Sequence, residues 1–457
     1  MTKQDSIASI QNTPENIDWD GLVWTEREFS HPERTIRIGT SFSGVGAIEY
    51  AFKRLGLNSQ ILFAGDIDKN CKKSYFANYT INDEQWHTDI HDFDATPFRN
   101  KIDLLVGGAP CQAFSTVGGQ LGFEDTRGTL FFDVERILKE KEPFGFVLEN
   151  VEGLVNHDKQ NPNDKIGRTL TIILDHLEAL GYKVSWKVLN AKHFGLPQDR
   201  KRIYIIGTKK EAPSMSGFSK TKACLGDILE QGLPTSNSSF VKLLIDHYKI
   251  EELCGKSIKD KRGGENNIHS WDIDYKGVIS QKEKDLLNQM LKERRKKKWA
   301  EEYGIDWMDG MPLTIDQIKT FYNDPELETM LSNLVSLGYL KLEHPKKKVA
   351  NKREQDPSLP LGYNIVAGKM SFEVSKVLDP KGIAPTLVAM DMEHLFVIDN
   401  KGLRTLSLRE GLRLFGYPDN YKFNISKQEG FDLLGNTVAV PVIKEVAGRV
   451  LDLLEVE

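Results

Sequence analysis

Apolar and polar residues alternate along the first 210 residues in a pattern that predicts strands and helices in turn. Residues 36–42 alternate as in a strand, and apolar residues then recur with helical spacing over 45–55. Further strands are predicted at 61–65, 102–106, 144–148, 184–189 and 202–207, with helices at 131–141 and 168–180. Strands that alternate with helices at this spacing predict an α/β fold with a doubly wound, mostly parallel sheet.

The alternation ends near Lys210, and the pattern beyond it predicts an inserted second domain. Residues 281–303 form a charged helical stretch, and residues 313–342 fit two helices followed by a short strand. That order suggests a small winged-helix-like module, but we favour a plain helical spacer. Helical periodicity returns at 407–415 and 438–454. We therefore predict an N-terminal extension (1–34), a sheet domain (35–212), an insert (213–385) and a C-terminal return to the sheet domain (386–457).

Composition excludes several classes of protein. The chain has 457 residues, 39% of them hydrophobic, so it can bury a full core. No apolar stretch approaches the ~20 residues of a membrane span, and the N-terminus does not resemble a signal segment. The four cysteines are too widely spaced for a metal site or a disulfide framework. We expect a cytoplasmic protein with no bound metal and no membrane partner.

The net charge does not decide whether the chain binds nucleic acid. The formal charge of −5 argues weakly against a nucleic-acid-binding protein. Lys and Arg are concentrated, however, in the runs 292–298 and 346–353, and binding depends on the local field. Such runs are often solvated surfaces, so they do not decide the question.

A glycine pair and an acidic residue suggest a nucleotide site. Phe42-x-Gly44-x-Gly46 lies between the first strand and its helix, where the backbone can approach a ligand. The next strand ends in Gly65-Asp66, and a carboxylate at this point can accept hydrogen bonds from ribose hydroxyls. Asp89, ahead of the third strand, offers another carboxylate. The residues alone leave a nicotinamide cofactor open.

Reactive side chains follow or open other strands of the same sheet. Cys111 lies on a glycine- and proline-rich loop directly after the strand 102–106. Glu149 ends the next strand, where burial favours a raised pKa. Arg200 and Arg202 open a third strand and can stabilise a thiolate or hold a carbonyl.

Together the motifs resemble those of the DNA cytosine carbon-5 methyltransferases of the prokaryotic restriction–modification type. Their order is Phe-x-Gly-x-Gly, Pro-Cys-Gln, Glu-Asn-Val, Gln-x-Arg-x-Arg and Gly-Asn-Thr, and the resemblance covers about 35–212 and 382–450. It implies S-adenosylmethionine as methyl donor, double-stranded DNA as partner, a monomer, and modification of one short target sequence. The insert takes the place of the family's target-recognition domain, and the sheet domain that of its catalytic and cofactor-binding domain.

The resemblance also assigns roles to residues. The catalytic residues would be Cys111, Glu149, Arg200 and Arg202: the Cys111 thiolate adds to carbon 6 of a flipped cytosine, protonated Glu149 donates to ring nitrogen 3, and Arg202 holds the carbonyl. The cofactor-binding residues would be Phe42, Gly44, Val45, Gly46, Asp66, Ile67, Asp89, Ile90, Gly108, Pro110, Leu130, Asn436 and Thr437. The DNA-binding residues would be Gln112, Ser115 and Arg127. The family usually has Glu at Asp66 and often an aromatic residue at Ile67.

Three other functions fit some of these residues. A nicotinamide-dependent oxidoreductase would explain the glycine loop and Asp66 but not Cys111 and Glu149 together. A transfer-RNA methyltransferase of the same family is a closer alternative, but that branch lacks a long insert. A catalytically inactive DNA-binding or scaffold protein is the third, and the filled reactive positions argue against it.

Overall fold

The structure is a computed structural model that describes residues 27–29, 31–99, 101–108, 130–161, 163–261, 263–305, 310–349, 352–367, 372–388 and 391–454. Pro110, Cys111, Gln112, Ser115 and Arg127 lie outside the described residues.

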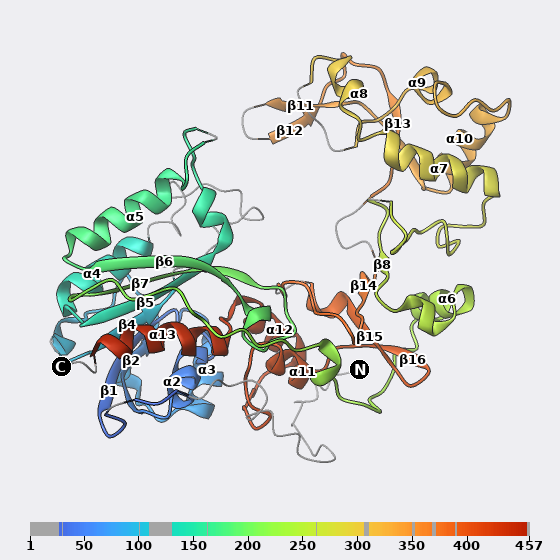
Figure 1. Cartoon of the computed structure of the whole chain (residues 1–457). Coiled ribbons are helices and arrows are strands. Elements are labelled where there is room, and N and C mark those ends of the chain that lie inside the picture. The colour runs from blue at the N-terminus through green and yellow to red at the C-terminus, as the bar shows by residue number, and fades with distance from the viewer. Residues whose placement is uncertain are drawn as a thin grey trace. The chain divides into compact units, whose positions relative to one another are not determined.

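The chain divides into two compact units (Figure 1). Unit 1 comprises Met1–Glu230, Pro380–Met392 and Leu406–Glu457, and unit 2 comprises Gln231–Asp379 and Glu393–Thr405. Along the chain, the first boundary between the units falls between Glu230 and Gln231, whereas the sequence pattern placed the start of the insert at residue 213. The segment 393–405 also belongs to unit 2 because it supplies two strands to the sheet of that unit.

Unit 1 is built on a seven-stranded sheet in the order β3-β2-β1-β4-β5-β7-β6. The strands are β1 (Thr35–Ser41), β2 (Asn58–Gly65), β3 (Trp86–His87), β4 (Leu104–Gly107), β5 (Gly145–Val151), β6 (Lys183–Asn190) and β7 (Lys201–Thr208). The strands from β3 to β5 in this order pair in parallel, while β7 is antiparallel to both of its neighbours. The predicted α/β fold with a doubly wound, mostly parallel sheet is confirmed.

Helices cover both faces of this sheet (Figure 1). The α-helices described in unit 1 are α2 (Ala47–Lys53), α3 (Lys69–Asn78), α4 (Leu130–Lys141), α5 (Arg168–Ala179), α11 (Leu408–Arg413), α12 (Lys427–Asn436) and α13 (Val440–Leu454). Side chains of α4 and α5, such as Ile137 and Leu170, pack with Phe63 and Phe146 of the sheet in one buried cluster. On the other face α13 contacts α2, β5 and β7. The sequence pattern predicted no helix over the residues of α12.

Strand order and direction decide which residues meet at the edge of the sheet. Because β1 lies between β2 and β4, the order of strands reverses there, and ligands of open α/β sheets bind at such a point beside the carboxyl ends. Because β7 runs opposite to β5, the beginning of β7 lies at the same edge. Val151 pairs with Arg202, and Glu149 pairs with Tyr204.

Unit 2 has two separate hydrophobic cores. The first lies around α6 (Ser239–His247) and a five-stranded sheet in the order β16-β15-β14-β8-β9. Its strands are β8 (Ser257–Ile258), β9 (Asn267–Ile268), β14 (Lys376–Val377), β15 (Leu395–Asp399) and β16 (Gly402–Thr405). The second core belongs to helices α7 (Gln281–Glu293), α8 (Lys297–Glu301), α9 (Ile315–Lys319) and α10 (Leu327–Ser336), with strands β10 (Leu340–Glu343), β11 (Lys346–Val349), β12 (Lys352–Gln355) and β13 (Gly362–Ile365). Among the helices described in either unit, none has the length and apolarity to cross a membrane.

Candidate active site

A buried carboxyl group and an arginine face each other at the carboxyl edge of the sheet. Glu149 lies near the end of β5, and its Oε1 is 3.1 Å from Nε of Arg202 at the start of β7. Each of the two side chains is only 13% exposed. Burial raises the pKa of Glu149 above its ordinary value, and the positive charges of Arg202 and, to a lesser extent, Arg200 oppose that rise. The site thus holds an acid that retains its proton more readily than a solvated glutamate.

The strand that leads to Cys111 ends directly against this carboxyl group. A Cβ atom on Gly108 would lie 2.7 Å from the backbone oxygen of Glu149 and 3.2 Å from its Oε2. Only a residue without a side chain allows the two backbones to approach this closely. The position three residues before Cys111 is therefore in contact with Glu149. The sequence had assigned Gly108 only to the cofactor pocket.

Arg200 occupies a different place from Arg202, although the two are separated by one residue. Its side chain is buried and donates to three backbone oxygens, those of Leu387 at 3.0 Å, Gly435 at 3.1 Å and Thr437 at 2.7 Å. Its guanidinium carbon also lies 5.1 Å from the centre of the Phe415 ring. These contacts indicate that Arg200 joins β7 to the C-terminal return of the chain.

The glycine loop after β1 is tied to the acidic residue after β2. The amide of Gly44 donates to Oδ2 of Asp66 at 3.0 Å, and the amide of Asp68 donates to Oδ1 at 3.0 Å. Phe42, Gly44 and Gly46 have positive φ values of 55°, 55° and 83°, so the chain makes a tight left-handed turn. Burial raises the pKa of Asp66, and the two amides oppose the rise. The predicted pair of Gly44 and Asp66 is thus brought into contact.

Two tyrosines that no motif identified bond the backbone of this loop, and a third bonds the turn at Thr437. The Tyr79 hydroxyl donates to the oxygen of Gly46 at 2.6 Å, and the Tyr421 hydroxyl donates to the oxygen of Val45. The Tyr417 hydroxyl lies 3.0 Å from the hydroxyl of Thr437. All three hydroxyls have raised pKa values because they are buried. Their partners are backbone or side-chain oxygens from distant parts of the sequence, so spacing offers no signal for them.

The other predicted cofactor residues differ in exposure. Ile67 is 74% exposed, directly beside Asp66, whereas Ile90 is buried in the core with its backbone oxygen accepting from Arg136 at 2.8 Å. Asp89 accepts from the amide of His91 at 3.0 Å. Phe42 and Leu130 pack against the same cluster as Ile90.

The Asn436-Thr437 turn lies where α12 ends. Thr437 is buried, and its backbone oxygen is one of the acceptors of Arg200, whereas the exposed Asn436 donates to the oxygen of Asp432 at 3.2 Å. Ser426 and Glu429 form a capping box at the start of α12. That Ser-x-x-Glu pattern is the signal by which α12 could have been found.

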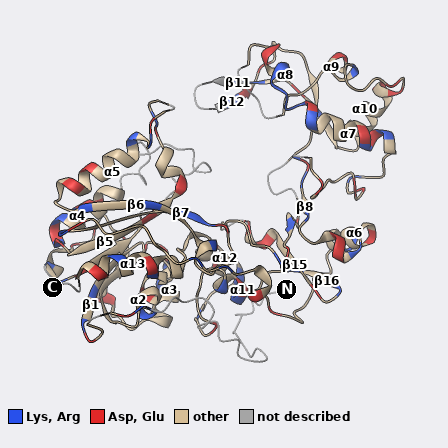
Figure 2. Cartoon of the chain, in the orientation of Figure 1, with Lys and Arg blue, Asp and Glu red and all other residues tan. Residues whose placement is uncertain are grey.

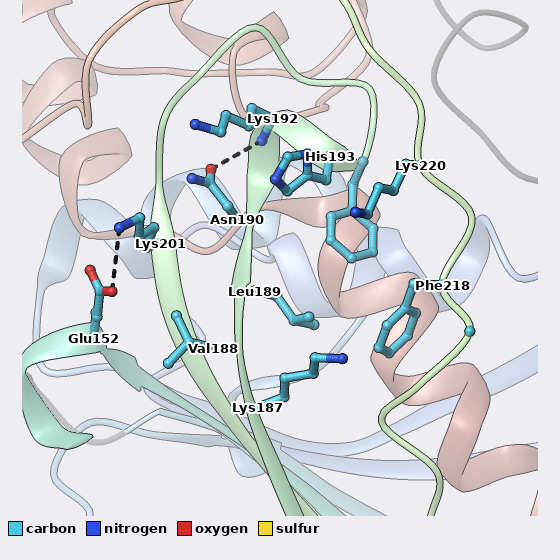
Figure 3. A pocket seen from close by; sticks show the side chains of 12 residues that line it. Glu152, Lys187, Val188, Leu189, Asn190, Lys192, His193, Lys201, Phe218 and Lys220 are labelled. Atoms are coloured by element: carbon cyan, nitrogen blue, oxygen red, sulfur yellow. Dashed lines mark hydrogen bonds and ion pairs between the residues drawn. The ribbon is translucent and has the colours of Figure 1, made fainter. Parts of the chain in front are cut away.

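A basic pocket lies beside the site, at the edge formed by β6 and β7 (Figure 3). Its volume is about 460 Å³. Lys187 donates to the oxygen of Met215 at 2.9 Å, Lys192 lies 3.1 Å from Asp199, and Lys201 lies 3.4 Å from Glu152. Each of these ammonium groups thus has a partner within unit 1, and we assign the pocket no function.

Comparison with known proteins identifies the family. The model of the C-5 cytosine-specific DNA methylases matches residues 36–452. The chain belongs to this family. It is therefore an enzyme, a DNA cytosine-5-methyltransferase, and the predicted resemblance is confirmed.

Individual relatives agree with this assignment. The chain is 58% identical over 417 residues to the Type II methyltransferase M.NlaIV of Neisseria lactamica, covering 90% of this chain and 98% of that protein. It is 38% identical to the Type II methyltransferase M.BanI of Aneurinibacillus aneurinilyticus, covering 89% of this chain and 93% of the relative. The solved structure of the Entamoeba histolytica methyltransferase EhMeth has the same fold, with a TM-score of 0.50, 14% identity and coverage of 92% of this chain and 99% of that one.

In this methylase, replacing Arg202 by Ala should raise the pKa of Glu149 further, because the positive charge that favours the ionised carboxylate is removed. Infrared difference spectra of the protonated carboxyl band, recorded against pH and assigned with Glu149→Gln, measure that pKa. Arg202→Lys should give a smaller rise, since it keeps the charge. An unchanged or lowered pKa in Arg202→Ala would contradict the pairing.

Proposed function

We propose that the chain methylates carbon 5 of a cytosine within one specific short sequence of double-stranded DNA, using base flipping and covalent catalysis by Cys111. The observation that best supports this is the contact of Gly108, at the head of the Cys111 loop, with the buried acid Glu149. A nucleophile on the loop that begins after Gly108 would lie within reach of a base bound over Glu149.

Carbon 5 of cytosine is a poor nucleophile, and addition of a thiolate to carbon 6 turns the ring into an enamine. Cys111 would supply the thiolate, forming the bond from its Sγ to carbon 6. Glu149 would donate its proton to ring nitrogen 3 as this bond forms, and the raised pKa of its carboxyl supports such a role. Arg202 would hold the carbonyl oxygen of the base. Once carbon 5 carries the methyl group, removal of the carbon-5 proton would restore the double bond between carbons 5 and 6, release the Cys111 thiolate and return the nitrogen-3 proton to Glu149.

The methyl donor would be S-adenosylmethionine, which supplies an electrophilic methyl group on a sulfonium. The residues at the switch point fit such a nucleoside. A Cβ on Gly44 would meet nothing within 4 Å, so the loop is open on that side, while a Cβ on Gly46 would strike the Tyr79 ring at 2.2 Å. Asp66 would accept hydrogen bonds from the ribose hydroxyls, and the exposed Ile67 would cover the adenine.

The resemblance to the family assigns the remaining residues of the cofactor site and of the DNA site. Val45, Asp89, Ile90, Gly108, Pro110, Leu130, Asn436 and Thr437 would complete the cofactor pocket. Gln112, Ser115 and Arg127 would contact the DNA strand around the flipped base, whose extrusion costs a few kcal/mol. Arg200 would act as a positioning residue, since its guanidinium holds the backbone of Thr437.

We further infer that the chain is the modification enzyme of a restriction–modification system, a role supported by the Type II methyltransferase names of its relatives. Such an enzyme acts on cellular DNA as a cytoplasmic monomer. Unit 2 would recognise the target sequence. Transfer of a tritiated methyl group to duplex DNA, to transfer RNA or to neither distinguishes the function from its alternatives, and bisulfite sequencing identifies the modified site.

Cys111→Ser should abolish methyl transfer while leaving cofactor binding nearly intact, because the weaker nucleophile cannot add to carbon 6. Cys254→Ser, in unit 2, is the matched control and should keep full activity. A duplex with 5-fluorocytosine at the target should form a covalent complex with the wild type, mapped to Cys111 by mass spectrometry. Turnover by Cys111→Ser, or a crosslink elsewhere, would remove Cys111 from this role.

Glu149→Gln should slow single-turnover methyl transfer by about 10²-fold or more, the usual contribution of a positioned acid. In the wild type, the contribution of Glu149 should be lost as pH rises through its raised pKa, because the protonated form is the active one. The residual rate of Glu149→Gln should lack that dependence. Glu152→Gln, at an exposed residue paired with Lys201, is the control. Equal rates for the two variants would refute the assignment.

Asp66→Ala should weaken binding of S-adenosylmethionine roughly 10- to 100-fold, since hydrogen bonds to a charged group contribute about 1.5–3 kcal/mol. Titration calorimetry measures the affinity. Asp66→Glu should retain binding, while Asp92→Ala, at an exposed acid on the segment before β4, should be neutral. The assignment fails if Asp66→Ala binds as tightly as Asp92→Ala.

A further inference from the structure

A buried acid beside the glycine loop (residues 42–46) takes no part in the chemistry proposed above. Glu49 is the acidic residue of α2, the helix that follows the loop, and Lys53 is the basic one (Figure 2). Glu49 is only 3% exposed, and burial raises its pKa to about 6. Because a buried acid is costly unless its oxygen atoms accept hydrogen bonds, the contacts of Glu49 indicate what it does there.

A chain of hydrogen bonds leads from Glu49 to the end of β2. The Thr40 hydroxyl donates to Oε1 of Glu49 at 2.6 Å, and the hydroxyls of Thr40 and Ser43 lie 2.8 Å apart. The amide of Gly65 donates to Oγ of Ser43 at 2.9 Å. Because a hydroxyl has one proton and that of Thr40 is used on Glu49, the proton between the two hydroxyls comes from Ser43. These four residues form a relay in which each hydroxyl both accepts and donates.

The relay holds the glycine loop against the strand that leads to Asp66. Ser43 is bonded to Gly65 in both directions, because its amide also donates to the oxygen of Gly65 at 2.8 Å. The next residues along the two segments, Gly44 and Asp66, make the 3.0 Å bond described above. The loop and the carboxylate are thus fixed relative to each other by neighbouring contacts, and the relay supplies the first of them.

The backbone of the loop needs such support. Phe42 has a φ of 55°, in the left-handed region that residues with a side chain rarely adopt. Such a residue stays in that region only where its surroundings impose the conformation. Phe42 directly precedes Ser43 of the relay. Loss of the relay would therefore let the loop adopt conformations in which Gly44 no longer meets Asp66.

A neighbouring hydroxyl offers a matched comparison. Ser41 follows Thr40 on β1 and is equally buried, but its hydroxyl has no hydrogen-bond partner within the described part of the chain. Successive side chains of a strand point to opposite faces, so Ser41 lies on the other face from the relay. Removing the Ser41 hydroxyl therefore alters the same strand and leaves the relay intact.

We propose that Glu49 is a positioning residue for the methyl donor, because through Thr40 and Ser43 it keeps the glycine loop in the conformation that binds the donor together with Asp66. This inference rests on the proposed function, which places S-adenosylmethionine at the loop and Asp66. A protein whose binding-competent conformation is only partly populated loses affinity by that fraction. The bound state is unchanged, so the relay sets the affinity for the donor and not the rate of methyl transfer.

The first test separates affinity from rate in full-length variants. Thr40→Val keeps the shape of the side chain but leaves Glu49 without its donor. Titration calorimetry with S-adenosylmethionine should show a Kd raised about tenfold, as expected if about one loop in ten stays competent. The kcat at saturating donor should stay near that of the wild type. Thr40→Ser, which keeps the hydroxyl, and Ser41→Ala should both bind as the wild type does.

A second test connects the relay with Asp66 in the absence of turnover. Thr40→Val should weaken binding much less in an enzyme that already carries Asp66→Ala, because residues that act through one contact are not additive. Without any ligand, the amide of Gly65 should exchange its hydrogen faster in Thr40→Val than in Ser41→Ala. A role in stability alone would lower the melting temperature of Thr40→Val and leave its Kd additive with that of Asp66→Ala.

The outcomes distinguish a failure of the relay from a failure of the cofactor site. The proposal is overturned if Asp66→Ala weakens binding while Thr40→Val binds as tightly as Ser41→Ala. If Asp66→Ala binds as the wild type does, the cofactor site is misplaced, and the role of the relay is refuted with it. Should Thr40→Val not fold, Ser43→Ala gives the answer. It breaks the relay at the other end by removing one oxygen atom, and its Kd should rise by a similar factor.

Discussion

The antiparallel course of β7 is the constraint on which the site depends. In a wholly parallel sheet the first residues of a strand lie at the edge opposite to the ligand. Because β7 reverses, Arg202 stands beside the end of β5 and 3.1 Å from Glu149. Burial alone would raise the pKa of Glu149, and the arginine limits that rise. The site can therefore hold a carboxyl group that is neither fully solvated nor left in the interior without a partner.

The C-terminal return of the chain completes this edge by contacts to backbone atoms. Arg200 donates to the oxygens of Gly435 and Thr437, and Tyr421 donates to that of Val45 in the glycine loop. Removing such a donor would leave buried carbonyl groups unsatisfied, which costs about 1–3 kcal/mol each. These contacts explain why the chain returns to unit 1 after an insert of about 150 residues. The glycine loop and the Asn436-Thr437 turn are held by the same group of buried tyrosines.

The two basic runs of unit 2 differ in their surroundings. Arg294 of the first run is buried and donates to Asn364, whereas β11 and β12 of the second run consist mostly of Lys and Arg. A formal net charge of −5 is thus compatible with a locally basic surface, because the local field depends on the nearest charges.

The sequence by itself determined the class of fold, most strands and helices, and the identity of the family. It did so because hydrophobic periodicity reports which face of an element is buried, and because five short motifs occur in one order. The contact of Gly44 with Asp66 also follows from the strand order that this fold class implies.

Only the tertiary structure decided which of two nearby arginines faces Glu149, that Gly108 touches that residue, and which tyrosines hold the loops. It also decided that β10 pairs with β13 and β11 with β12. These features depend on strand direction and on pairing between residues far apart in the chain. Local propensity contains no information about either.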